Sequence, residues 1–306
     1  IINFSVWAII YLGGVQVNAG ALGTGDVIAL YNYMSQILVE LIKLANLIIS
    51  ISKALASASR IADVLDIEST ENMGTLTIGK DTDAAVEFRS ASLTYPGSSE
   101  PSLEPLSFIA RRGETVGIIG GTGSGKSTLI NMIPAFYKAT SGEVLVCGEN
   151  VTDYTPEALR SLIGVVPQSA VLFEGTIREN MLWGNENATD EDILDAVKTA
   201  QALDVVEGKG GLDAAVEQGG RNLSGGQKQR LTIARALVRR PEILILDDSA
   251  SALDYATDAA LRKAIRGLDG TTVFIVSQRA SSVMYSDKII VLDDGEAVGI
   301  GTHSEL

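Results

Sequence analysis

Residues 120–127 read Gly120-Gly121-Thr122-Gly123-Ser124-Gly125-Lys126-Ser127, which fits the pattern G-x-x-x-x-G-K-[ST]. The apolar run 115–119 before them predicts a strand, and a helix is expected to open at Ser127. Glycines let the backbone turn tightly, so that its N–H groups and the start of the helix face an anion. Lys126 is then expected to reach the β- and γ-phosphates of a nucleotide, and the Ser127 hydroxyl to bind Mg²⁺. These eight residues and Thr128 are therefore predicted to bind ATP.

Short apolar runs alternate with helical stretches along most of the remaining chain. Strands are predicted at 115–119, 243–246, 272–276 and 289–292, and helices at 191–202 and 227–238. Continuous apolar strands separated by helices are typical of an α/β fold with a mostly parallel, covered sheet. An alternating strand is expected to begin near Ala85. Asp294-Gly295, between two apolar runs, predicts a hairpin near the end of the chain.

Two further stretches carry chemistry. Ile243 to Asp247 is an apolar strand that ends in a carboxylate, and Asp247 is placed to hold Mg²⁺ beside a phosphate loop. Leu223-Ser224-Gly225-Gly226-Gln227-Lys228-Gln229-Arg230 puts a serine cap and two glycines at the start of a helix. Such a terminus attracts an anion. Ser224, Gly225, Gly226 and Gln227 are therefore predicted to contact a nucleotide as well, which is unusual for a domain that already has a phosphate loop.

Leu223 to Arg230 resembles, almost letter for letter, the signature motif of the ATP-binding cassette (ABC) transporter superfamily. The whole chain resembles exporters whose transmembrane helices are fused ahead of the cassette. The resemblance implies a P-loop NTPase cassette with a mostly parallel core sheet, an antiparallel β subdomain and a helical subdomain at about 169–224. It also implies a second half-transporter as partner, because two cassettes of this family pair head to tail. Each signature helix then closes over the ATP held by the other cassette, which accounts for the second anion site.

The resemblance assigns roles to three further places in the chain. Tyr95 matches the aromatic residue that stacks on adenine, and an ordinary strand-end tyrosine is the alternative. Gln168 matches the Q-loop glutamine, which senses Mg²⁺ and couples the cassette to the membrane helices. Ser251-Ala252-Leu253-Asp254 matches the D-loop at the seam of the cassette dimer.

Two positions depart from the family pattern. Hydrolytic members carry a glutamate after the strand-end aspartate, where this chain has Asp248. The shorter side chain should stand back from the attacking water by about 1.5 Å, which can cost about a hundredfold in rate. The switch histidine is replaced by Gln278, which can hydrogen-bond a phosphate but cannot carry a charge. Asp248, Gln278 and Gln168 are the predicted catalytic residues, and both departures in one ATP site predict the slow, degenerate subunit of a heterodimeric exporter.

Residues 1–66 predict the end of an exporter transmembrane domain, with helices at about 1–17 and 26–66. The second is long enough to cross a hydrocarbon core of about 30 Å, and the first, which begins without Met inside an apolar run, is expected to be truncated. Cations gather from Lys53 onward, so the turn at 18–25 is predicted to lie outside and the cassette in the cytoplasm. The protein is then expected to be a multi-pass protein of the cell membrane whose helices contact lipid. A buried hairpin in a soluble core is the alternative. A polar linker is expected at 67–83, and the cassette at 84–306.

Glu40 and Lys43 share one helical face of the second predicted helix, as either a pair lining the transport pathway or a mutually satisfied pair.

Charge and composition limit the possible partners and functions of the chain. The net charge of −14 argues against a nucleic-acid partner. Cys147 is the only cysteine, so no intramolecular disulfide can form. Three other functions stay open: a homodimeric exporter with slow sites, a cassette ATPase outside transport, and an importer ATPase.

Overall fold

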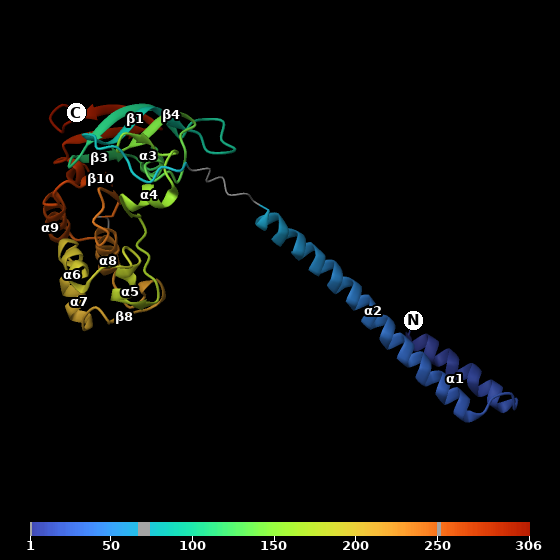
Figure 1. Ribbon diagram of the computed structural model, residues 1–306. Coiled ribbons are helices and arrows are strands. Elements are labelled where there is room, and N and C mark those ends of the chain that lie inside the picture. Colours follow the sequence, from blue (N-terminus) through green and yellow to red (C-terminus); the bar gives the residue numbers. More distant parts are fainter. Residues whose placement is uncertain (1, 67–73, 250–251) are drawn as a thin grey trace. The chain divides into compact units, whose positions relative to one another are not determined.

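The computed structural model describes residues 2–66, 74–249 and 252–306 (Figure 1). The chain divides into two compact units, Ile1–Glu71 and Asn72–Leu306, and each is described by itself. In the first unit, α1 (Ile2–Asn18) and α2 (Thr24–Leu65) lie side by side as a helical hairpin. The Asp26 carboxylate accepts a hydrogen bond of 2.9 Å from the Gly23 N–H and so caps the start of α2.

Among the described residues, α2 is the one helix long and apolar enough to cross a membrane. Its 42 residues extend about 63 Å at 1.5 Å per residue, roughly twice the thickness of a hydrocarbon core. No residue of α2 is buried, so this unit alone does not cover the helix's apolar side chains. Lys43 donates to Glu40 at 2.7 Å, and about two thirds of each side chain is exposed. This is the contact that a mutually satisfied pair requires.

Six strands form the central sheet of the second unit, in the order β12-β11-β3-β10-β9-β6. The first strand, β12, pairs antiparallel with β11, and the other neighbours are parallel. Side chains of β3 and β9 are buried on both faces, because the crossovers between parallel strands place helices over the sheet. The bounds are β3 (Thr115–Gly120), β6 (Ile163–Val166), β9 (Ile243–Asp247), β10 (Thr272–Ser277), β11 (Lys288–Asp293) and β12 (Glu296–Gly301).

A second, antiparallel sheet has the order β2-β1-β4-β5. The strand bounds are β1 (Ala84–Leu93), β2 (Leu103–Arg111), β4 (Ser141–Val146) and β5 (Glu149–Asn150). Phe88 of β1 stacks on Phe108 of β2 at 4.7 Å between ring centroids, and Phe108 meets Phe274 of β10 edge-on at 6.5 Å. Helix α3 (Lys126–Met132) packs its buried side chains in the same core. The helix that follows the phosphate loop is therefore fixed by both sheets.

Four helices form a separate lobe: α5 (Ile177–Leu182), α6 (Asp190–Thr199), α7 (Leu203–Lys209) and α8 (Gly225–Leu237). In Figure 1 this lobe lies on the far side of the central sheet from β1 and β4. Capping boxes fix two helix starts, Thr176 with Glu179 at α5 and Thr189 with Asp192 at α6. Apolar residues of the lobe share a second core with the sheet and with α9 (Tyr255–Arg266).

The layout matches the predicted fold class, with three additions. Residues 163–166 form β6, and the two-residue strands β7 (Gly175–Thr176) and β8 (Ala215–Val216) pair in the lobe. All three strands are too short to carry a periodic pattern.

Residues 74–83 of the predicted linker lie against the cassette, where the Gly74 N–H donates to Thr152 O at 2.7 Å and the Lys80 N–H to Cys147 O at 2.9 Å. The rest of that linker, 67–73, lies outside the described residues.

Candidate nucleotide-binding site

The predicted phosphate, metal and catalytic residues converge because four neighbouring strands are parallel. The strands β3, β10, β9 and β6 are adjacent, and their registers place Ser277 opposite Ile119, Val276 opposite Asp247, and Leu246 opposite Val166. The loops that follow these strands begin at one edge of the sheet. Ligands in α/β sheets bind at this carboxyl edge. Residues far apart in the sequence therefore contribute to one site.

The phosphate loop depends on glycine for its shape. Gly123 and Gly125 have φ of +83° and +90°, in the left-handed region that glycine adopts without strain. A Cβ on Gly125 would also lie 2.7 Å from Ser102 O, and one on Gly120 would lie 2.2 Å from Leu292 O. The loop is therefore packed against the backbone of β11 and of the residue just before β2, at points where no other side chain fits.

Lys126 lies over the loop that it follows. Its ammonium group donates to Gly120 O at 3.0 Å, to Ser124 Oγ at 3.3 Å, and to Gly121 O. The residue is 9% exposed. Burial lowers the pKa of its ammonium group, while the nearby carboxylates of Asp247 and Asp248 act in the opposite direction. An ammonium group that is bonded to neutral oxygens would form stronger, charge-assisted bonds to a phosphate.

Ser127 and Asp247 are in contact, with Ser127 Oγ donating to Asp247 Oδ2 at 3.1 Å. Hydroxyl and carboxylate oxygens are the hard ligands that Mg²⁺ prefers, and Mg²⁺ often keeps waters between itself and a carboxylate. The pair therefore fits a Mg²⁺ ion. Burial raises the pKa of the Asp247 carboxyl, and the hydrogen bond from Ser127 opposes that rise. The described residues contain no cluster of three or more His, Cys, Asp or Glu side chains for a metal, and Mg²⁺ needs none where phosphates supply ligands.

Asp248 lies beside the end of β10, where its N–H donates to Val276 O at 3.1 Å. Its φ of +42° is in the left-handed region, which Asp tolerates better than most residues. Gln168 Nε2 reaches the carboxylate of Asp248 over 3.5 Å, a long contact. Gln278 follows Ser277 at the end of β10 and is exposed. The structure thus brings Gln168 to Asp248, with Gln278 on the neighbouring strand end.

Tyr95 is half-buried beside the start of α3. Its hydroxyl lies 3.2 Å from Thr128 Oγ1, and its ring meets Tyr137 edge-on at 4.9 Å between centroids. Tyr137 is 43% exposed and is not among the predicted site residues. No motif marks Tyr137, because it approaches Tyr95 only through the fold. The two rings form an aromatic corner next to the phosphate loop, which suits a purine base.

The signature residues form the start of α8. Ser224 and Gln227 make a reciprocal capping box: the Ser224 N–H donates to Gln227 Oε1 at 2.9 Å, and the Gln227 N–H to Ser224 Oγ at 3.3 Å. Ser224 and Gly225 are exposed, and a Cβ on Gly226 would lie 3.1 Å from Ala252 O. Within the described residues, the side chain of Ser224 contacts its own capping box and not the phosphate loop.

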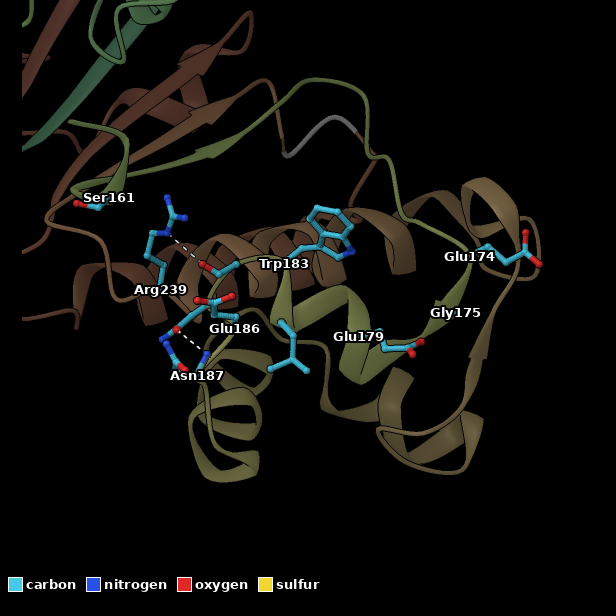
Figure 2. A pocket seen from close by; sticks show the side chains of 11 residues that line it. Ser161, Glu174, Gly175, Glu179, Trp183, Glu186, Asn187 and Arg239 are labelled. Carbon is cyan, nitrogen blue, oxygen red and sulfur yellow. Dashed lines mark hydrogen bonds between the residues drawn. The ribbon is translucent and has the colours of Figure 1, made fainter. Parts of the chain in front are cut away.

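The D-loop lies next to the start of α8. Asp254 caps α9 by accepting from the Thr257 N–H at 3.0 Å. Ser251, the first residue of that predicted motif, lies outside the described residues. A groove of about 1010 Å³ lies elsewhere, among α5, the loops beside it and Arg239 of the segment after α8. Figure 2 shows Trp183, Glu174 and Arg239 around it, and it includes none of the predicted site residues.

Comparison with known proteins agrees with this geometry. Residues 103–251 match the family model described as ABC transporter. The chain is 43% identical over its whole length to the ABC transporter ATP-binding protein YfiB of Bacillus subtilis, covering 53% of that protein. It is 38% identical to the ATP-dependent lipid A-core flippase of Xanthomonas campestris pv. campestris, over 98% of this chain and 51% of the flippase. The chain thus spans about half the length of the curated relatives it matches.

The chain is also similar to the solved structure of a bacterial Atm1-family ABC exporter with ATP bound. The match covers 99% of this chain and 54% of the exporter chain, with a TM-score of 0.74 and 29% identity. The relatives and this exporter cover the N-terminal helices as well as the cassette. The family match and the edge of the sheet where the phosphate loop, Asp247 and Gln168 meet point to the same assignment. The chain therefore holds the ATP-binding region of an exporter-type ABC transporter, preceded by N-terminal helices.

Proposed function

We propose that this chain is one subunit of a heterodimeric ABC exporter, holding ATP on its own phosphate loop and completing its partner's ATP site with its own signature helix. One observation carries the proposal. An exposed signature terminus, fixed by a capping box, occurs in the same cassette as a site whose catalytic positions hold Asp248 and Gln278. The exposed signature terminus supports a role in completing the partner's ATP site, and the Asp248 and Gln278 pair supports slow turnover at the chain's own site.

In this proposal the phosphate loop binds ATP through its backbone N–H groups and Lys126. The ammonium group leaves the carbonyls of Gly120 and Gly121 for the β- and γ-phosphates, where its charge is better satisfied. Ser127, Asp247 and Gln168 would hold Mg²⁺, which offsets phosphate charge when bound. Tyr95 and Tyr137 would pack against the adenine, and Thr128 would add its hydroxyl beside them.

Slow hydrolysis follows from the two departures. Asp248 is fixed by the bond between its N–H and Val276 O, so its short carboxylate cannot advance by the length of a methylene without moving the backbone. Gln278 is exposed and offers an amide in place of a titrating ring, so it can donate a hydrogen bond but cannot gain a proton. Asp248 is therefore a weak general base at this site.

The membrane placement rests on α2. Its apolar surface, which its own unit does not bury, would be covered by lipid and by other helices of a multi-pass domain in the cell membrane. The turn between α1 and α2 has no Lys or Arg, whereas Lys53 and Arg60 follow the apolar part of α2. This asymmetry supports a cytoplasmic cassette. Glu40 and Lys43 would then lie either in the pathway or against another helix.

Subunit-specific labelling with a photoreactive ATP analogue tests the ATP site. Lys126→Ala should abolish most labelling of this chain, whereas Lys198→Ala, on the exposed face of α6, should leave it intact. Equal labelling of both variants would remove the assignment of the phosphate loop. Purification of the full-length protein then separates the dimers, since a second, related chain at equal amount is expected and a single chain would favour the homodimer with slow sites.

A further inference from the structure

Arg262 lies on α9, two turns after the D-loop, and its guanidinium group is almost fully engaged. Nε donates to Asp258 Oδ1 at 2.9 Å, and Nη2 donates to Asp258 Oδ2 and, at 2.9 Å, to Ser282 Oγ. Nη1 donates to Ser281 O at 2.9 Å. Arg262 and Asp258 are each only 14% exposed. Asp258 therefore fixes the plane of the guanidinium group, and the remaining donors reach a different segment.

That segment is α10 (Ala280–Val283), a single helical turn separated from Gln278 by Arg279. A helix of one turn leaves most of its carbonyls without partners in the helix, and Arg262 supplies a donor to the carbonyl of Ser281. On the other side of Gln278, Ser277 Oγ accepts from the Arg279 N–H at 3.0 Å. Gln278 is exposed and lies between these two fixed points.

We infer that Arg262 is a positioning residue for Gln278: it clamps α10 to α9 and so holds the Gln278 loop where a γ-phosphate would meet it. The inference rests on the proposed function, because it assumes ATP on this chain's phosphate loop. The clamp also joins the Gln278 loop to the helix that Asp254 caps at the D-loop. The position of Gln278 and the position of the D-loop helix are therefore coupled through one side chain.

Arg266, four residues later on the same helix, provides a matched control. Its guanidinium group lies 5.2 Å from the ring centroid of Tyr285, and among the described residues it makes no hydrogen bond to α10. Lysine at position 262 would keep the charge but could not reach Asp258, Ser281 and Ser282 together, because it lacks the planar fork. The position therefore requires arginine for its geometry and not only for its charge.

The test is the preference of this chain's site for ATP over ADP, measured by competition against photolabelling of this subunit in the complete transporter. Gln278 would touch only the terminal phosphate, so Arg262→Met should lower the preference by up to about tenfold through ATP alone. Arg262→Lys should lower it nearly as much, and Arg266→Met should not change it. Adding Arg262→Met to Gln278→Ala should cause no further loss, since both act on one contact.

Several results would overturn the clamp. They are an unchanged preference in Arg262→Met, equal loss of ATP and ADP affinity, additive loss in the double variant, or no effect of Gln278→Ala. If Arg262→Met does not fold, Ser282→Ala removes one bond of the clamp, leaves the ion pair, and must still lower the preference. Loss of labelling in Lys126→Ala with an unaltered preference in Arg262→Met would reject the clamp and leave the ATP site in place.

Discussion

Under the proposed function, Asp248→Asn and Ser224→Arg would separate the chain's own ATP site from the one it completes on a partner. Asparagine matches aspartate in size, keeps the N–H bond to Val276 O, and can accept from Gln168 as Asp248 does at 3.5 Å. The fold should therefore be unchanged and only the basicity lost. If Asp248 works as the general base, turnover should fall by about 10²–10⁴-fold, whereas in a degenerate site it should stay within about twofold.

Ser224→Arg acts at the other site. It removes a helix cap worth about 1 kcal/mol and places a long cation on the exposed terminus that would face the partner's ATP. A loss of that size does not unfold a domain of ordinary stability. Ser224→Ala is the control, because it loses the cap without adding bulk. Phosphate release by the purified transporter should be abolished by Ser224→Arg and nearly kept by Asp248→Asn. A hundredfold loss in Asp248→Asn would refute the unequal sites.

Three further outcomes are expected. With the partner's site inactivated, Asp248→Glu combined with Gln278→His should raise residual ATP hydrolysis by roughly tenfold or more, and no gain would show that other residues limit the site. In a Cys147→Ser background, a cysteine at Ala21 should react with an impermeant thiol reagent outside intact cells and one at Ser98 should not; the reverse pattern would invert the topology. Burial raises the pKa of Tyr154 to about 12, so the folded state favours the neutral phenol. Its contribution to the free energy of unfolding is fully present below pH 10 and should be lost, by roughly 2–3 kcal/mol, as the pH rises to 12. The urea midpoint of Tyr154→Phe should not show this decrease with pH.

Local motifs account for what could be predicted from the sequence. The phosphate loop, the strand before Asp247 and the cap at Ser224 each lie within a few consecutive residues, where side-chain type determines backbone geometry directly. The predicted strands at 115–119, 243–246, 272–276 and 289–292 lie within β3, β9, β10 and β11 and differ from them by at most one residue at each end. The mostly parallel core sheet was predictable because continuous apolar strands in this order leave few alternatives, whereas the antiparallel and helical subdomains were predicted only from the family resemblance.

Long-range contacts account for what could not be predicted. Tyr137 meets Tyr95 across 42 positions, and Arg262 reaches Ser281 across 19; neither pair has a pattern in the sequence. Residues 74–83 were predicted to be linker because they are polar, but their backbone bonds to the cassette, and Gly79 lies against a buried tyrosine. A Cβ there would lie 2.4 Å from the Tyr154 hydroxyl oxygen. Burial of that tyrosine cannot be inferred before the fold is known.

The parallel register at the edge of the central sheet has an evolutionary consequence. The apolar strands β3, β9 and β10 stabilise the cassette, while the groups that would act on ATP follow the last residue of each strand. A change from glutamate to aspartate or from histidine to glutamine in such a loop removes no buried apolar contact. After gene duplication, one copy can therefore lose catalytic groups by neutral drift and still fold, provided that its twin retains them. Selection would then preserve the signature helix of the weaker copy, because the stronger copy depends on it.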